Sequence, residues 1–140
     1  MRVLFDTNVV LDLLLDRMPF ANNAASLFAK VERSEITGYL CATTVTTVHY
    51  LLAKAMDARD ANAHIKTLIA MFEIAAVNRL VIEQAIEVGL TDFEDAVFYQ
   101  AASHAGVDYI VTRNAGDFKK STIPIYDPRE FVSVLRSHTE

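Results

Sequence analysis

Four aspartates stand at positions where an α/β fold could bring their side chains together for chemistry. Asp6 directly follows the apolar run Val3-Leu4-Phe5, and Asp92, Asp95 and Asp117 lie far along the chain. Open α/β sheets bind ligands at the carboxyl ends of their strands, so a carboxylate that ends a buried strand is a candidate site residue. Carboxylates that are buried together repel one another unless a cation lies between them. A cation site at one end of a sheet is therefore the chemistry to consider.

Each of these acids also has a structural explanation when it is taken alone. Asp6 could cap the helix that follows it, Asp92 could cap a helix with Asp95 solvated, and Asp117 could be an ordinary turn residue. Asp92 and Asp95 are three residues apart at an expected helix start, so they share one face. The joint occurrence of all four favours a site, provided that the first strand and the strand over 109–112 are neighbours at the switch point of the sheet.

Short apolar runs alternate with helical patterns along the chain, which is typical of βα units and a parallel sheet. The expected strands are 3–5, 36–42, 73–77, 109–112 and 123–126. The expected helices are 8–15, 21–33, one from a Thr43 or Thr44 cap through Met56, one from an Asp60 cap to Phe72, 81–90, one from Thr91 or Asp92 to Gly106, and 128–135. We expect one doubly wound α/β domain over residues 1–140.

Composition indicates a soluble cytoplasmic protein. The 140 residues include one cysteine, Cys41, which cannot form an internal disulfide and favours a reducing compartment. Acidic residues interrupt the first apolar segments, so we expect no membrane span. The net charge of −5 argues against a general nucleic-acid-binding surface, although a cluster of metal-binding carboxylates also makes a chain acidic.

Three segments, taken in order, resemble the motifs of the PIN-domain nucleases. They are Val3-Leu4-Phe5-Asp6-Thr7-Asn8, Asp92-Phe93-Glu94-Asp95-Ala96 and Ile110-Val111-Thr112-Arg113-Asn114-Ala115-Gly116-Asp117-Phe118. The resemblance runs over nearly the whole chain. It implies a three-layer α/β/α sandwich with a small parallel sheet, an acidic pocket for Mg²⁺ or Mn²⁺, and cleavage of RNA phosphodiester bonds. It also implies a toxin of a toxin-antitoxin pair that forms a homodimer and is silenced by an antitoxin protein.

Carried over position by position, the resemblance implies roles for particular residues. Asp6, Asp95 and Asp117 match metal-binding acids, and Asp92 would assist them. The implied supporting residues are Asn8, Thr112 and Asn114, the last standing where many members carry aspartate, and the implied RNA contacts are Arg113, Lys119 and Lys120. For the two lysines a solvated loop is the alternative.

The helix after the second strand departs from the family pattern. Many members carry a glutamate there, and aligning Val45-Thr46-Thr47-Val48-His49 with that segment places His49 at the glutamate position. His49 shares a helical stripe with Val45, Leu52 and Met56, so we expect it to face inward as a core histidine with its hydrogen bonds satisfied. A metal ligand is the alternative, and imidazole suits Mn²⁺ better than Mg²⁺. Asp92 could supply the missing carboxylate.

Three rival functions are considered. A haloacid-dehalogenase-like phosphatase requires a second aspartate two residues after the first, and this chain has Asn8 there. A receiver domain requires an acidic pair, a phosphoacceptor and a late lysine, in an order that the chain does not show. The remaining alternative is a PIN-like module with weakened catalysis that binds RNA or a protein.

Overall fold

A computed structural model describes residues 1–139 and is built around a five-stranded parallel sheet in the order β3-β2-β1-β4-β5. The strands are β1 (Arg2–Phe5), β2 (Thr37–Cys41), β3 (Glu73–Ala75), β4 (Tyr109–Val111) and β5 (Ile125–Tyr126). In the register, Phe5 of β1 pairs with Leu40 of β2 and Val111 of β4. The chain order reverses at β1, so β1 and β4 are neighbours at the switch point, as the sequence predicts.

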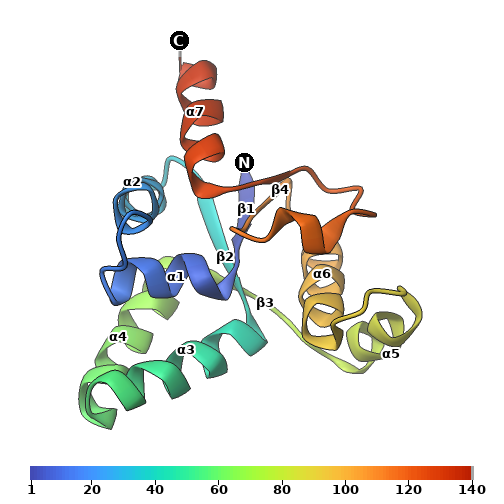
Figure 1. Ribbon diagram of the computed structural model, residues 1–140, viewed down its shortest axis with the longest axis horizontal. Coiled ribbons are helices and arrows are strands. Elements are labelled where there is room, and N and C mark those ends of the chain that lie inside the picture. The colour runs from blue at the N-terminus through green and yellow to red at the C-terminus, as the bar shows by residue number, and fades with distance from the viewer. Residues whose placement is uncertain (140) are drawn as a thin grey trace.

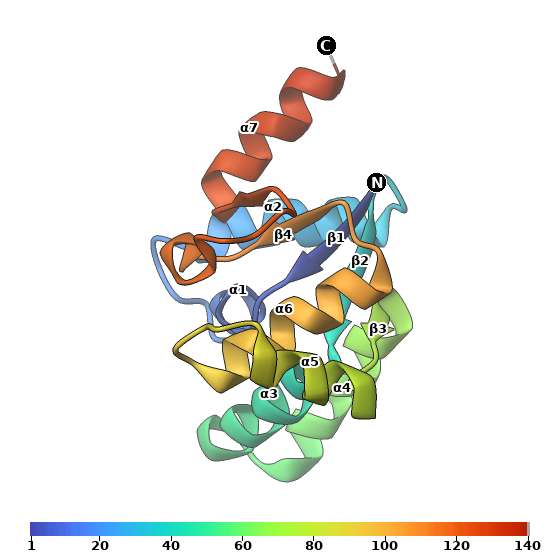
Figure 2. The ribbon, with the colours of Figure 1, turned by 90° about the vertical axis from the view of Figure 1, so that its right-hand side faces the viewer.

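Helices cover both faces of the sheet and give the three-layer α/β/α arrangement predicted above (Figures 1 and 2). One face carries α1 (Thr7–Leu14), α2 (Ala21–Glu32), α3 (Ala42–Ala55), α4 (Ala58–Met71) and α7 (Pro128–Thr139). The other carries α5 (Arg79–Glu87) and α6 (Phe93–Ala105), and a short 3-10 helix, η1 (Ala115–Phe118), follows β4. Within residues 1–139, no helix combines the length and apolar character that a membrane crossing requires.

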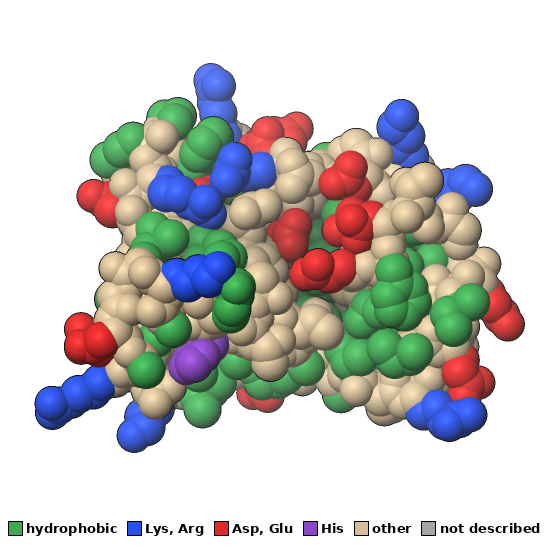
Figure 3. All heavy atoms as spheres, turned by 60° about the horizontal axis from the view of Figure 1, so that its bottom comes forward, with side chains coloured by type: hydrophobic (Ala, Val, Ile, Leu, Met, Phe, Trp, Pro, Cys, Tyr) green, Lys and Arg blue, Asp and Glu red, His purple; other side chains and the backbone are tan. Residues whose placement is uncertain are grey.

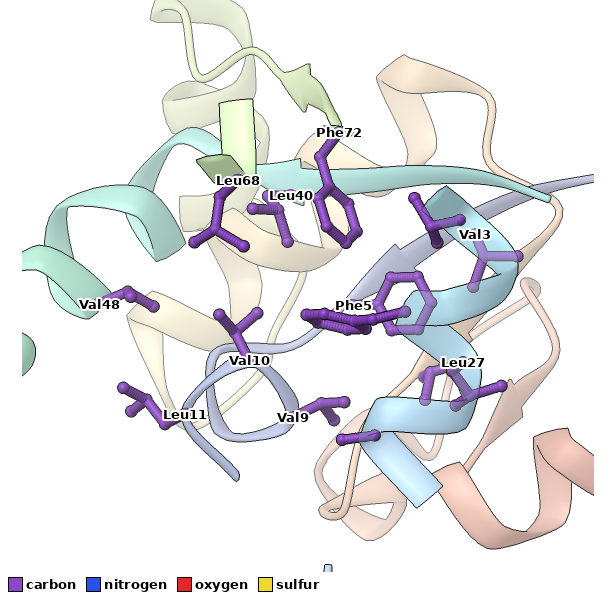
Figure 4. Packing of buried hydrophobic residues seen from close by; sticks show 14 of the residues in the cluster. Val3, Phe5, Val9, Val10, Leu11, Leu27, Leu40, Val48, Leu68 and Phe72 are labelled. Carbon is purple, nitrogen blue, oxygen red and sulfur yellow. The ribbon is translucent and has the colours of Figure 1, made fainter. Parts of the chain in front are cut away.

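Alternation along β1 divides the core into two layers. Val3 and Phe5 point into the cluster beneath α1 and α2, whereas Leu4 joins the cluster beneath α6. The ring of Phe5 packs edge-on against Phe28 and Phe72, with centroids 5.3 and 5.8 Å apart (Figure 4). Because β1 is buried on both faces, its carboxyl end is a rigid base for the residue that follows it.

Gly38 in β2 is required by the same aromatic packing. A Cβ atom at this position would lie 2.6 Å from the ring of Phe72 and 3.0 Å from Val31. Any larger residue would push Phe72 off the sheet, so the close approach of α4's end to β2 depends on glycine.

Two helices are capped differently from the prediction, and α5 begins at Arg79, two residues earlier than expected. α3 starts at Ala42, immediately after β2, so Thr43 and Thr44 lie inside its first turn and neither caps it. Asp57 caps α4 in place of Asp60, and its carboxylate accepts the backbone N–H of Asp60 at 2.8 Å.

Candidate functional site

Asp6 joins β1 to α1, and two hydrogen bonds hold its carboxylate. Oδ1 accepts the backbone N–H of Thr7 at 2.8 Å, and Oδ2 accepts the hydroxyl of Thr112 at 2.7 Å. The hydroxyl oxygen of the buried Thr112 also accepts the N–H of Asn114 at 3.0 Å, which leaves its hydrogen for Asp6. Burial raises the pKa of the Asp6 carboxyl, and the Thr112 hydroxyl opposes the rise. Asp6 therefore caps α1 and also presents a fixed carboxylate at the carboxyl end of β1.

The other three aspartates act on the same region from α6 and η1. Asp92 is the N-cap of α6, and its side chain accepts the N–H of Asp95 at 3.0 Å. Burial, and then the negative charges of Asp92, Asp117 and Asp6, raise the pKa of Asp95 to about 6. Acidic side chains gather near the middle of this face of the molecule in Figure 3. Carboxylates from the end of β1, from α6 and from η1 thus share one electrostatic environment, in which the charge of Asp117 disfavours the ionisation of both Asp6 and Asp95.

These side chains suit a divalent cation in their chemistry. The donors are carboxylate and hydroxyl oxygens, which small, hard divalent cations prefer. Within residues 1–139, no three acidic, histidine or cysteine side chains lie close enough together to coordinate one metal ion. A small cation that retains several of its waters requires only one or two direct carboxylates. The four aspartates therefore fit a cation that is held partly through water.

Arg113 lies beside the acidic residues and is held there by a buried ion pair. Its Nε is 2.8 Å from Oδ2 of Asp12, and its Nη2 donates to Oδ1 at 3.1 Å. Nε of Arg17 lies 3.0 Å from the same carboxylate, which is fully buried. The charge of Arg113 slightly lowers the pKa of Asp6. The sequence prediction missed this cluster, although Asp12 inside an apolar helix was its signal, since a buried carboxylate requires cationic partners.

Of the predicted supporting residues, Thr112 contacts Asp6 through its side chain, whereas Asn8 and Asn114 do not. The side chain of Asn8 makes no hydrogen bond to Asp6 in the part of the chain described; the backbone carbonyl oxygen of Asn8 accepts a hydrogen bond from Nη2 of Arg17 at 3.4 Å. The adjacent Thr7 instead donates its hydroxyl to Thr44 of α3 at 3.0 Å. Asn114 reaches Thr112 through its backbone, and its side chain, like those of Lys119 and Lys120, is exposed.

The prediction that His49 is a core histidine is wrong. The buried row of α3 is Thr44, Val48 and Leu52, so the helix is rotated relative to the predicted stripe. His49 is half-buried, and its Nε2 lies 2.7 Å from Oδ1 of Asn62 on α4. It therefore contacts the neighbouring helix and takes no part in the acidic cluster. Packing against α4, which the period of α3 alone cannot reveal, sets this rotation.

Comparison with known proteins places the chain in a family. The sequence model of the PIN domain matches residues 2–116. A toxin-antitoxin complex from Klebsiella pneumoniae has a TM-score of 0.69 and 19% identity, covering 90% of this chain and 97% of that chain. VapBC-1 from nontypeable Haemophilus influenzae also has a TM-score of 0.69, with 15% identity, covering 92% of this chain and 99% of that chain. VapC20 of Mycobacterium tuberculosis, a sarcin-ricin loop cleaving toxin, has a TM-score of 0.62 and 17% identity, covering 77% and 86%.

No curated protein sequence matches the chain. The structural likenesses, at these identities, establish the fold. The family match spans most of the chain and includes Asp6, Asp92 and Asp95, ending one residue before Asp117. The chain belongs to the PIN domain family.

Proposed function

We propose that the chain is an endoribonuclease that hydrolyses RNA phosphodiester bonds with the help of Mg²⁺ or Mn²⁺. The observation that carries the proposal is that Asp6 at the end of β1, Asp92 and Asp95 at the start of α6 and Asp117 in η1 act on one region, where burial, and then the charges of the other three, raise the pKa of Asp95 to about 6. Membership of the PIN domain family and the likeness to an RNA-cleaving toxin support it.

Each residue of the site has a proposed role. The bound cation would polarise the scissile phosphoryl group and lower the pKa of the attacking water. Asp6, Asp95 and Asp117 would hold it, with Asp92 assisting directly or through water. Thr112 would keep Asp6 oriented through its hydroxyl, because a ligand whose partner fixes its direction binds more tightly.

A cleavage assay with matched variants tests the proposal. Purified protein is incubated with structured and unstructured RNA in Mg²⁺, in Mn²⁺ and in chelator. We expect cleavage with either metal, and a loss of about 100-fold or more in chelator and in Asp6→Asn. Asp60→Asn, an exposed acid on α4, is the matched control and should cleave like the wild type. Cleavage that survives the chelator or the Asp6 substitution would contradict the proposal.

A second candidate is a PIN-like module that binds RNA without cutting it. Two observations favour it. Residues 1–139 contain no three acidic, histidine or cysteine side chains placed to bind one metal ion, and His49 contacts α4 and not the aspartates of the candidate site. Thr44 is the residue of α3 that contacts the first motif, through the hydroxyl of Thr7, and α3 contains no glutamate. RNA binding without cleavage in either metal would favour this candidate.

We also propose a protein antitoxin as partner, because a structure with this fold is a toxin-antitoxin complex from Klebsiella pneumoniae. A groove of about 240 Å³ between α1, α2 and α4 could take an apolar segment. Its apolar lining includes Leu13, Leu14, Ala25, Phe28, Ala29, Leu68 and Met71.

The exposed Ala25 allows this docking site to be tested. We expect Ala25→Arg to abolish co-purification with the product of an adjacent short reading frame, and Ala70→Arg, on an exposed part of α4, to leave it unchanged. Equal co-purification of both variants would exclude the groove. The homodimer stays a prediction, which light scattering would test.

A further inference from the structure

Arg113 connects the acidic site to a cavity that none of the roles above uses. The cavity has a volume of about 440 Å³ and lies between the start of α2, the segment after β4 and the start of α7. It is lined by Pro19, Phe20, Asn23, Arg113, Asp127, Pro128 and Arg129. Its volume is in the range of small-ligand pockets, roughly 300–1,000 Å³. Basic side chains also gather on the face that carries the acidic group (Figure 3).

The guanidinium of Arg113 is fixed in the wall of this cavity. Asp12 binds its Nε and Nη2, and its carbon atom lies 4.0 Å from the centroid of the Phe20 ring. The third nitrogen, Nη1, makes no hydrogen bond within the described residues. Arg113 therefore keeps N–H donors for an anion. Because its side chain is already held in place, little side-chain entropy is lost when an anion binds, and a planar guanidinium matches the geometry of phosphate.

Phe20 supplies an aromatic surface beside this cation. Its side chain is 38% exposed and precedes α2, so its ring is available to a ligand. Aromatic and guanidinium planes together are the surfaces on which proteins stack single-stranded bases. Asn23, in the first turn of α2, adds an amide that can both donate and accept hydrogen bonds at a base edge.

The charge of the cavity favours an anionic ligand. Among the residues that line it, Arg113 and Arg129 are cations and Asp127 is an acid, and Arg113 shares its charge with Asp12 behind the wall. Oδ1 of Asp127 already accepts the N–H of Glu130 at 2.8 Å, and Glu130 in turn accepts the N–H of Asp127 at 3.0 Å. Asp127 is thus committed to capping α7. An anion with a flat aromatic part satisfies the remaining groups.

We propose that this cavity binds one unpaired nucleotide of the RNA strand, next to the phosphate that is cut, with its base on Phe20 and its phosphate on Arg113 and Arg129. The inference rests on the proposed function, because Arg113 is the group that links the cavity to Asp6. Only an unpaired base can leave its stack to reach Phe20, so the cavity would direct cleavage to loops or single-stranded ends.

Binding measured without cleavage tests the inference separately from the nuclease activity. A labelled single-stranded RNA is titrated by fluorescence anisotropy with Asp6→Asn protein in chelator. Adding Phe20→Ala should weaken binding roughly 5- to 150-fold, the range for loss of one stacked base, whereas Phe20→Tyr should retain most of the affinity. Arg129→Ala should weaken binding and flatten its dependence on salt. The matched controls are Tyr50→Ala and Arg59→Ala, two exposed residues on other helices, which should bind like the parent.

RNAs with one abasic nucleotide, placed at each position in turn, show whether a single base occupies the cavity. One abasic position should lose as much affinity as Phe20→Ala, and this loss should disappear in the Phe20→Ala background. The thermal unfolding midpoints of all variants are measured first. If Phe20→Ala does not fold, the RNA affinity of Arg129→Ala alone tests whether the cavity binds RNA.

Two results would overturn the inference even if RNA is cleaved. One is RNA affinity equal to the controls in both cavity variants. The other is a loss of antitoxin binding with unchanged RNA binding in Phe20→Ala, which would assign the cavity to a protein partner. Conversely, binding that depends on Phe20 in a protein that never cleaves RNA would support the cavity and reject the nuclease.

Discussion

Asp6, which is half-buried, and Asp12, which is fully buried, are six residues apart, but their surroundings are opposite. Asp12 is fully buried between two arginines, with Nε of Arg17 at 3.0 Å and Nε of Arg113 at 2.8 Å. Asp6 accepts two hydrogen bonds, and burial and the charge of Asp117 both raise its pKa. The charge of Asp12 is balanced by two arginines of the same chain, whereas Asp6 lies near other acidic side chains.

The contrast separates a structural acid from a candidate functional one. A buried carboxylate whose charge is balanced by arginines contributes to the fold, and the acid cluster around Asp6 lacks such a balance. Asp12 also orients Arg113, which reaches toward Asp6, so the structural pair supports the candidate site. The comparison predicts that neutralising Asp12 damages the fold, while neutralising Asp6 damages only the function.

The largest effect on stability is expected for Asp12→Asn. The substitution keeps the size of the side chain but leaves Arg17 and Arg113 without their carboxylate, and we expect the free energy of unfolding to fall by about 3 kcal/mol. Urea denaturation measures the change. Asp6→Asn is the matched variant and should stay within about 1 kcal/mol of the wild type. An equal decrease in the free energy of unfolding of the two variants would contradict the assignment of Asp12 as a structural acid and Asp6 as a functional one.

The pH dependence of metal binding is the next expected effect. The pKa of Asp95 is raised to about 6, so below that pH a cation must displace a proton from its carboxyl. The association constant for Mn²⁺ should fall by up to tenfold per pH unit below about 6, and should level off above it. Isothermal titration calorimetry from about pH 5 to about pH 7.5 measures it. An affinity independent of pH across this range would show that Asp95 does not bind the ion.

The smallest effect concerns stability without metal. The folded pKa of Asp95, about 6, exceeds its ordinary value of 3.8, so this group favours the fold most below pH 3.8 and loses that contribution as the pH rises through 6. Asp95→Asn should therefore be more stable than the wild type at pH 7, by about 1 kcal/mol after screening by solvent. Urea denaturation in chelator should show the difference shrinking toward about pH 4. A destabilised variant at pH 7 would contradict the raised pKa of Asp95.

Much of the fold could be predicted because it depends on local patterns. The apolar runs at β1 and β4 and the cap at Asp92 placed three acids at one edge of the sheet, and the strand order bears out the adjacency this required. Gly106 ends α6 in the left-handed conformation, as its position after the helix indicates.

The sequence predictions failed where contacts between distant parts of the chain determine the position of a side chain. His49 had the right helical spacing for the core, but α3 buries Thr44, Val48 and Leu52, which leaves His49 half-buried beside Asn62 of α4. Phe20 and Arg129 lie near opposite ends of the chain and outside the three motifs, and no local pattern shows that they line one cavity with Arg113. Asp12 carried a local signal, a charge inside an apolar helix, but its two arginine partners are identified only by the folded chain.

Mn²⁺ binding to the wild type and to Asp6→Asn tests the central claim most directly, because that claim is that the unbalanced carboxylates around Asp6 hold a cation. Calorimetric titration at about pH 7 should show a site in the wild type and in Asp60→Asn that weakens by about tenfold to 100-fold or disappears in Asp6→Asn. Equal affinity for Mn²⁺ in all three proteins would contradict the account.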